Sequence, residues 1–143
     1  MSTRSRATNP GSVHDVNRPL RLLVVMDPIQ AIDPAKDSSF AMLLEAQMRG
    51  WSSHYAELGD LWLRDGTAWG RVTEVRVQDD AQDWFELGAS ADARLGDFDV
   101  ILMRKDPPFD AEYVFATYIL ERAESAGTLV VNRAQSLRDA NEK

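Results

Sequence analysis

Two adjacent basic residues, Arg104 and Lys105, follow directly on an apolar run, Val100–Met103. A guanidinium in this position can bind a carboxylate through two parallel hydrogen bonds, and an ammonium can add a point charge. The structural alternative is an ion pair with Asp106 or Asp110. Because successive side chains alternate along an extended chain, we expect Lys105 to point away from Arg104. Arg104 is therefore the first candidate for binding an anionic substrate.

A second group of polar residues follows another apolar run, Leu20–Met26. Asp27 could coordinate a metal, bind a ligand amine or cap a turn, and turn chemistry is usual for an Asp-Pro pair. Ser38 and Ser39 stand at an expected helix start, where backbone N–H groups attract anions. Capping of the helix is the alternative role of these hydroxyls. Asp27, Ser38 and Ser39 are therefore further substrate-binding candidates.

Other catalytic signals are missing from the sequence. There are no cysteines, which excludes disulfides and thiolate metal sites. The two histidines, His14 and His54, have no plausible triad or ligand partner. The sequence contains no GxGxxG, GxxxxGK[ST] or HExxH motif. The residues by themselves name no catalytic residue and no metal ligand.

Composition limits the partners of the chain. Its 143 residues suit one domain, and a hydrophobic content of 44% is enough for a packed core. The net charge of −7 argues against nucleic acid and against an anionic membrane surface. With no secretory signal and no apolar run that could span a bilayer, we expect a cytoplasmic protein. The polar residues 1–18 predict a disordered tail, and residues 19–143 the folded domain.

Two strand–helix–strand units are expected on either side of the middle of the chain. The first has strands at Leu20–Met26 and Ser53–Leu58 and a helix over 39–49, between an Asp37 cap and a Gly50 stop. The second has strands at Phe98–Met103 and Thr128–Val131 and a helix over 111–126, between Asp110 and Gly127. The residues expected on the buried face of this helix are Ala111, Phe115, Tyr118, Ile119 and Ala123.

The middle of the chain predicts a hairpin. Leu61–Arg64 and Thr67–Val77 flank the turn dipeptide Asp65-Gly66. Beyond it we expect a short strand or turn at Trp84–Leu87 and a loop over Gly88–Gly96. The tryptophans in and around this region are interpreted as core or interface residues.

These elements predict a Rossmann-like three-layer α/β domain with a mainly parallel sheet and a β-hairpin insertion. A last helix is expected to begin at Ser136–Asn141. Ligands bind beyond the carboxyl ends of the strands in such sheets. That rule selects residues 27–37 and 104–110, where Pro107 and Pro108 make the turn beside Arg104 rigid.

Several long stretches of the sequence resemble the N-terminal domain of prokaryotic glutathione synthetase. The resemblance covers roughly residues 20–143 in family order, and it is loose in the hairpin and over residues 79–97. The matching stretches are Val25–Ile29, Lys36–Gln47, Asp99–Asp110, Ala116–Ala123, Val131–Asn132 and Gln135–Asp139.

The resemblance implies a pre-ATP-grasp domain of an ATP- and Mg2+-dependent ligase. The family joins γ-glutamylcysteine to glycine through an acyl phosphate and releases glutathione. It implies that the ATP-grasp domain lies downstream and is absent here, so that this chain alone is inactive and binds no cofactor itself. It also implies that Arg104 binds the peptide, whereas Asp27, Ser38 and Ser39 match motif positions without assigned contacts.

Two other readings stay open at this point. A receiver-like signalling module would use Asp27 as a phosphoacceptor, but such modules need an acidic pair near the first strand. A non-catalytic ligand-binding or oligomerisation domain is compatible with the resemblance, and we expect a homo-oligomer.

Overall fold

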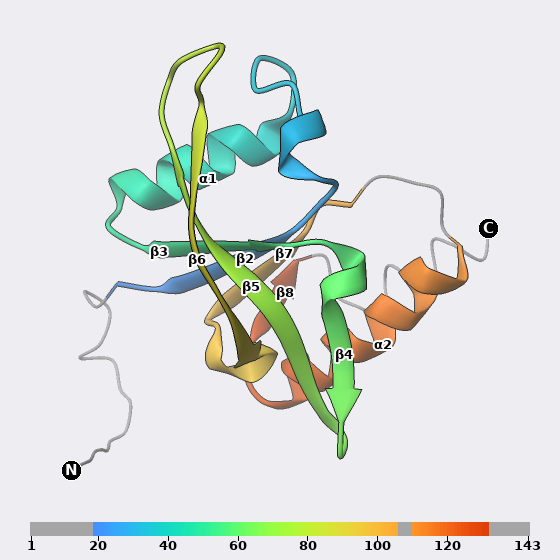
Figure 1. Cartoon of the computed structure of the whole chain (residues 1–143). Helices are drawn as coiled ribbons and strands as arrows, with labels where there is room; N and C mark the ends of the chain where they lie inside the picture. Colours follow the sequence, from blue (N-terminus) through green and yellow to red (C-terminus); the bar gives the residue numbers. More distant parts are fainter. Residues whose placement is uncertain (1–18, 106–109, 132–143) are drawn as a thin grey trace.

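The computed structural model describes residues 19–105 and 110–131. Within them a seven-stranded sheet separates two helices, α1 (Ser38–Met48) and α2 (Ala111–Ser125), which lie on opposite sides of it (Figure 1). The strands are β2 (Arg21–Val25), β3 (Ser52–Ala56), β4 (Leu61–Arg64), β5 (Thr67–Val77), β6 (Phe85–Arg94), β7 (Val100–Met103) and β8 (Leu129–Val131). The predicted three-layer α/β class is confirmed.

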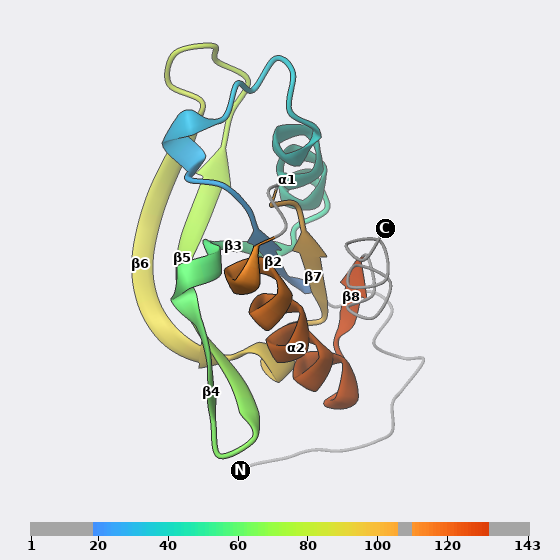
Figure 2. The same cartoon turned by 90° about the vertical axis from the view of Figure 1, so that its right-hand side faces the viewer.

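The parallel half of the sheet is built from the two predicted strand–helix–strand units. Strand β2 pairs in parallel with β3 on one side and with β7 on the other, and β7 pairs in parallel with β8. Strand β5 runs antiparallel to β3, β4 and β6, and it bends away from the parallel strands (Figure 2). The insertion between the two units therefore extends the same sheet instead of forming a separate domain.

Strand β2 is buried on both faces, as its continuous apolar sequence predicts. Leu23 and Val25 pack into the core under α2, whereas Leu22, Val24 and Met26 pack into the core under α1. All five side chains are at most 2% exposed. A strand with two apolar faces needs a covering layer over each of them, and here α1 and α2 supply the two layers.

The ends of both helices follow the predicted local chemistry. The Asp37 carboxylate accepts a hydrogen bond from the Ser39 N–H at 2.7 Å, and that of Asp110 accepts one from Tyr113 at 3.0 Å. Gly50 and Gly127 follow the two helices with φ values of 79° and 109°. These caps confirm the predicted helix boundaries to within one residue.

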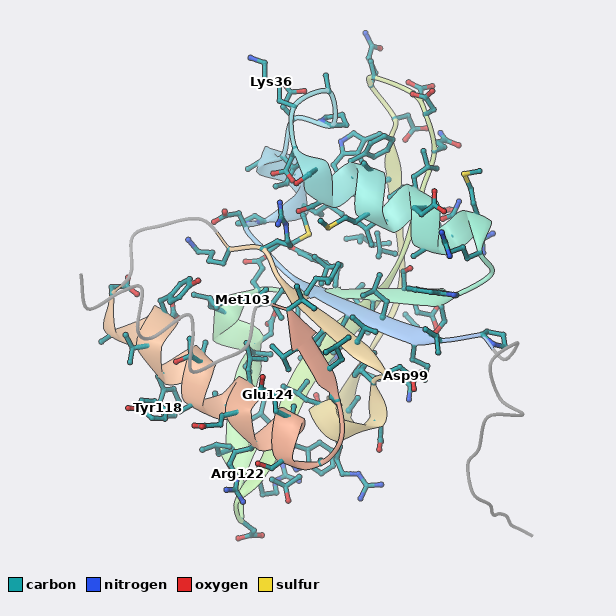
Figure 3. The ribbon with its side chains drawn as sticks, turned by 180° about the vertical axis from the view of Figure 1, so that it is seen from behind. Lys36, Asp99, Met103, Tyr118, Arg122 and Glu124 are labelled. Atoms are coloured by element: carbon teal, nitrogen blue, oxygen red, sulfur yellow. The ribbon has the colours of Figure 1, made fainter. Side chains whose placement is uncertain are left out.

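The buried face of α2 differs from the prediction. Ile119 and Ala123 are buried as expected, but Phe115 and Tyr118 are 54% and 50% exposed, and Ala111 is also exposed. Figure 3 places Tyr118 on the outer side of the helix. The core side carries Tyr113, Ala116, Thr117 and Leu120 instead. Thr117 can be buried because its hydroxyl donates a hydrogen bond to the Val114 carbonyl at 2.6 Å. The prediction assigns the buried face of α2 by the polarity of its residues, and it is therefore partly wrong.

The predicted hairpin is present. Strands β4 and β5 are antiparallel, and the turn residues Asp65 and Gly66 have φ values of 53° and 79°, as a two-residue hairpin turn requires. On β4 and β5 the rings of Trp62 and Trp69 stack at 6.4 Å. The Arg122 guanidinium of α2 donates to the Gly66 carbonyl at 3.0 Å, which fastens the hairpin tip to the helix.

The loop predicted over Gly88–Gly96 is wrong, because residues Phe85–Arg94 form the ten-residue strand β6. Eight of its ten residues are exposed, so its sequence of small and charged residues shows no buried face. The free edge of β5 supplies the backbone partners, from Trp69 opposite Arg94 to Val77 opposite Phe85. Trp84, 5% exposed, anchors the start of β6 against Phe40 of α1 at 5.5 Å.

Three predicted features lie outside the described residues: the tail over residues 1–18, the proline turn at 106–109, and the helix at 136–141. In the described part, neither helix is long and apolar enough to cross a bilayer.

His54 gives the fold a testable dependence on pH. Its ring packs edge-on against Phe98 at 5.3 Å, and burial, with a further contribution from Arg21, lowers its pKa below the usual 6.5 despite the opposing charge of Glu74. The unfolded chain therefore binds more protons than the folded one at mildly acidic pH. We expect the free energy of unfolding to fall as the pH drops below about 6.5, until the folded pKa is passed. Urea unfolding across this range measures the slope, and the wild type should lose more than His54→Gln. Parallel curves would refute the prediction.

Candidate functional site

The two predicted loops meet at one edge of the sheet. Strands β2, β3 and β7 are parallel, so their carboxyl ends lie side by side. The chain leaving β2 stays attached to its neighbours, because Met26 N–H donates to Ala56 at 3.0 Å and Arg104 N–H donates to Val25 at 2.7 Å. In Figure 3 Met103 marks the carboxyl end of β7, and Asp99 lies just before the start of this strand.

Arg104 reaches across this edge to the start of α1. Its Nη2 donates a hydrogen bond to the Ser38 hydroxyl. Its Nε is buried and has no hydrogen-bond partner among the described residues. A guanidinium carries five N–H donors and the Ser38 hydroxyl takes one of them, so Arg104 retains donors for an acceptor. The structure thus brings together Arg104 and Ser38, which the sequence places 66 positions apart.

Lys105 joins the same edge at a different point from Arg104. Its ammonium lies 3.0 Å from the Asp27 carboxylate, with side chains 21% and 27% exposed. Strand β7 ends at Met103, so both basic residues lie just beyond its carboxyl end. Their side chains diverge, as predicted: Arg104 contacts Ser38 at the start of α1, and Lys105 contacts Asp27 in the loop after β2.

Ser39 lies behind this surface. Its side chain is 1% exposed, and its hydroxyl has no hydrogen-bond partner among the described residues. The backbone N–H of Ser39 is the group that Asp37 caps. The two neighbouring serines therefore differ, with Ser38 at the surface beside Arg104 and Ser39 inside the helix start.

A shallow pocket of about 350 Å³ opens beside Asp27. Its lining residues are Asp27, Pro28, Ala31, Ile32, Asp33, Lys36 and Asp37. Lys36 stands on the loop before α1 (Figure 3). Three carboxylates line the pocket, yet no group of three His, Asp or Glu side chains in residues 19–105 and 110–131 is arranged to hold a metal ion. Within those residues the edge offers charges and hydrogen bonds for a polar ligand.

Tyr55 and Glu57 belong to this edge, and sequence reasoning missed both. The Tyr55 side chain is 6% exposed, and its hydroxyl accepts a hydrogen bond from Ile29 N–H at 3.2 Å and donates one to Glu57. Burial, followed by the hydrogen bond to Glu57, raises the pKa of Tyr55 above its usual value. Inside a strand pattern a tyrosine looks like core, and its position near the carboxyl end of β3 was the only available signal.

Comparison with known proteins identifies the domain. Residues 20–138 match the family described as "Prokaryotic glutathione synthetase, N-terminal domain". The chain belongs to this family. The match confirms the resemblance found in the sequence. The Rossmann-like fold described above is therefore that of a glutathione synthetase N-terminal domain.

Named relatives agree with this family. The chain is 60% identical over 124 residues to "Glutathione synthetase" of Yersinia pestis and of Pseudomonas aeruginosa, and 57% identical to that of Escherichia coli K12. Each match covers 87% of this chain and 39% of the relative. The glutathione synthetase N-terminal domain described here therefore spans about two fifths of the length of these relatives.

The ion pair between Asp27 and Lys105 can be measured in this chain. Both side chains are largely buried, so we expect a coupling free energy of about 1 kcal/mol in a double-mutant cycle of Asp27→Asn and Lys105→Met. Urea unfolding of the two single variants and the double variant supplies the cycle. The exposed pair of Arg49 and Glu45, at 2.8 Å, is the matched control and should couple less. Additive effects at Asp27 and Lys105 would contradict the pairing.

Proposed function

We propose that this chain is the peptide-binding N-terminal part of a glutathione synthase, an ATP-dependent ligase that joins γ-glutamylcysteine to glycine. Family membership supports the assignment, since the matched relatives are named glutathione synthetase. The observation that carries the binding role is the edge itself, where Arg104 and Lys105 meet Ser38 and Asp27. Both substrates and the product carry carboxylates, which these two cations can bind.

Arg104 is the principal anion-binding group in this proposal. Its guanidinium bonds to Ser38, which sets the orientation of the fork, and its remaining N–H donors can bind a substrate carboxylate. Asp27 lies beside the second cation and would bind the ammonium group of the peptide, with Lys105 on an adjacent carboxylate. Ser39 supports the helix start from inside, because its side chain is 1% exposed.

The role of these residues is orientation and not proton transfer. When bound to the full-length protein, ATP would supply the phosphoryl group that activates the carboxylate of γ-glutamylcysteine as an acyl phosphate, with ADP as the leaving group and Mg2+ on the phosphate oxygens. A peptide fixed at Arg104 and Asp27 presents that carboxylate in one position, which lowers the entropic cost of the reaction. We assign ATP and Mg2+ to the part of the synthetase that this chain does not match.

The role of Arg104 is tested in a full-length synthetase that carries this chain as its N-terminal part. Arg104→Ala removes a charge-assisted contact, so the KM for γ-glutamylcysteine or for glycine should rise about 10- to 100-fold. The free energy of unfolding should change by less than about 1 kcal/mol. Arg49→Ala, which removes an exposed guanidinium on α1, is the control and should leave both KM values unchanged. Unchanged KM values in Arg104→Ala would remove this residue from the site.

If this chain binds the peptide and another part of the synthetase binds ATP and Mg2+, the 143-residue chain alone should not catalyse the reaction. ADP release in the presence of ATP, Mg2+, γ-glutamylcysteine and glycine should stay at the background rate, whereas the full-length protein turns over. Robust ADP release from the 143-residue chain would place the ATP site within it and contradict the assignment of ATP to another part of the synthetase.

A further inference from the structure

The hydroxyl of Tyr55 takes the place of a missing helix cap. A short 3-10 helix over Ile29–Ala31 begins directly after Pro28, which offers no side-chain oxygen to the first N–H groups. Ile29 is fully buried, so its N–H requires an acceptor inside the protein. Tyr55 supplies this acceptor from the neighbouring strand β3, at 3.2 Å.

Two successive residues of β3 hold the chain on either side of Asp27. Before it, the Met26 N–H donates to the Ala56 carbonyl at 3.0 Å. After it, the Ile29 N–H donates to the Tyr55 hydroxyl. Asp27 stands between these two bonds, with its carboxylate 3.0 Å from Lys105. Its position relative to the cations at the end of β7 therefore depends on a side chain of β3.

Glu57 fixes the direction of the Tyr55 hydroxyl. The phenol donates its hydrogen to the Glu57 carboxylate, which leaves an oxygen lone pair for the Ile29 N–H. A charged acceptor also polarises the hydroxyl and strengthens the bond that it accepts. The three groups thus form a chain from the Glu57 carboxylate through Tyr55 to the backbone of the loop.

We propose that Tyr55, oriented by Glu57, is a positioning residue for peptide binding, because it holds the Asp27 loop against the Lys105 and Arg104 end of β7. The inference rests on the proposed function, since it takes this edge as the peptide site. Tyr55 does not touch the peptide. It acts through the backbone at Ile29, which fixes the angle at which the loop leaves β2.

The test uses Tyr55→Phe in a full-length synthetase that carries this chain. Phenylalanine keeps the ring but leaves the Ile29 N–H without its acceptor, so the loop should shift. We expect the KM for γ-glutamylcysteine to rise about three- to tenfold while kcat changes less than about twofold. Amide hydrogen exchange should quicken at Ile29–Ala31 and stay unchanged in β7. Tyr118→Phe, which removes a hydroxyl from the outer side of α2, should alter neither quantity.

A Glu57 series keeps the proposal testable if Tyr55→Phe fails to fold. Glu57→Ala removes the acceptor of the phenol and should raise the same KM, whereas Glu57→Gln keeps a neutral acceptor and should restore part of the affinity. Equal KM values in wild type, Tyr55→Phe and Glu57→Ala would overturn the positioning role while Arg104→Ala still raises KM. If Arg104→Ala also leaves KM unchanged, the proposed peptide site fails, and this inference fails with it.

Discussion

The burial of β2 on both faces is the constraint on which the rest of the domain depends. Its odd and even side chains belong to different cores, one under α1 and one under α2. Helix α1 returns the chain from β2 to the parallel strand β3, and α2 returns it from β7 to the parallel strand β8. Because β7 also pairs in parallel with β2, the ends of β2, β3 and β7 lie at one edge. The polar residues that follow those strands meet at this edge, because a strand that is buried on both faces cannot carry polar side chains within it.

At this edge, charged side chains of both signs are held on a rigid support. Arg104 and Lys105 come from the end of β7, and their partners are Ser38 at the start of α1 and Asp27 in the loop after β2. The loop is tied to β3 before and after Asp27, so the anionic and cationic groups keep a fixed spacing. A ligand with both an ammonium and a carboxylate matches such a surface better than a simple anion, and the peptide substrate that we propose for this edge carries both groups.

Local chemistry made much of this fold readable from the sequence. Apolar runs, the Asp37 and Asp110 caps and the Asp65-Gly66 turn predicted the elements, and topology then placed Asp27 and Arg104 at one edge. Strand β6 could not be predicted, because its small and charged residues form a strand only against the free edge of β5. The Lys105 contact and the Tyr55 hydrogen bond were also hidden, since both depend on which side chains neighbouring strands bring within reach.

Strand β6 also affects how the domain behaves among other copies of itself. In the described part of the chain it pairs only with β5, so its second edge presents unpaired backbone groups. Such an edge is a template for association with another chain. Glu86, Asp92 and Arg94 place charges along it, and the exposed residues from Gly88 to Ala91 are small, so that Leu87, 38% exposed, is the one exposed large hydrophobic side chain of the strand. The charged and small residues of β6 make the strand hard to predict from the sequence. The same residues disfavour the pairing of this edge with a strand of another chain, and so disfavour aggregation.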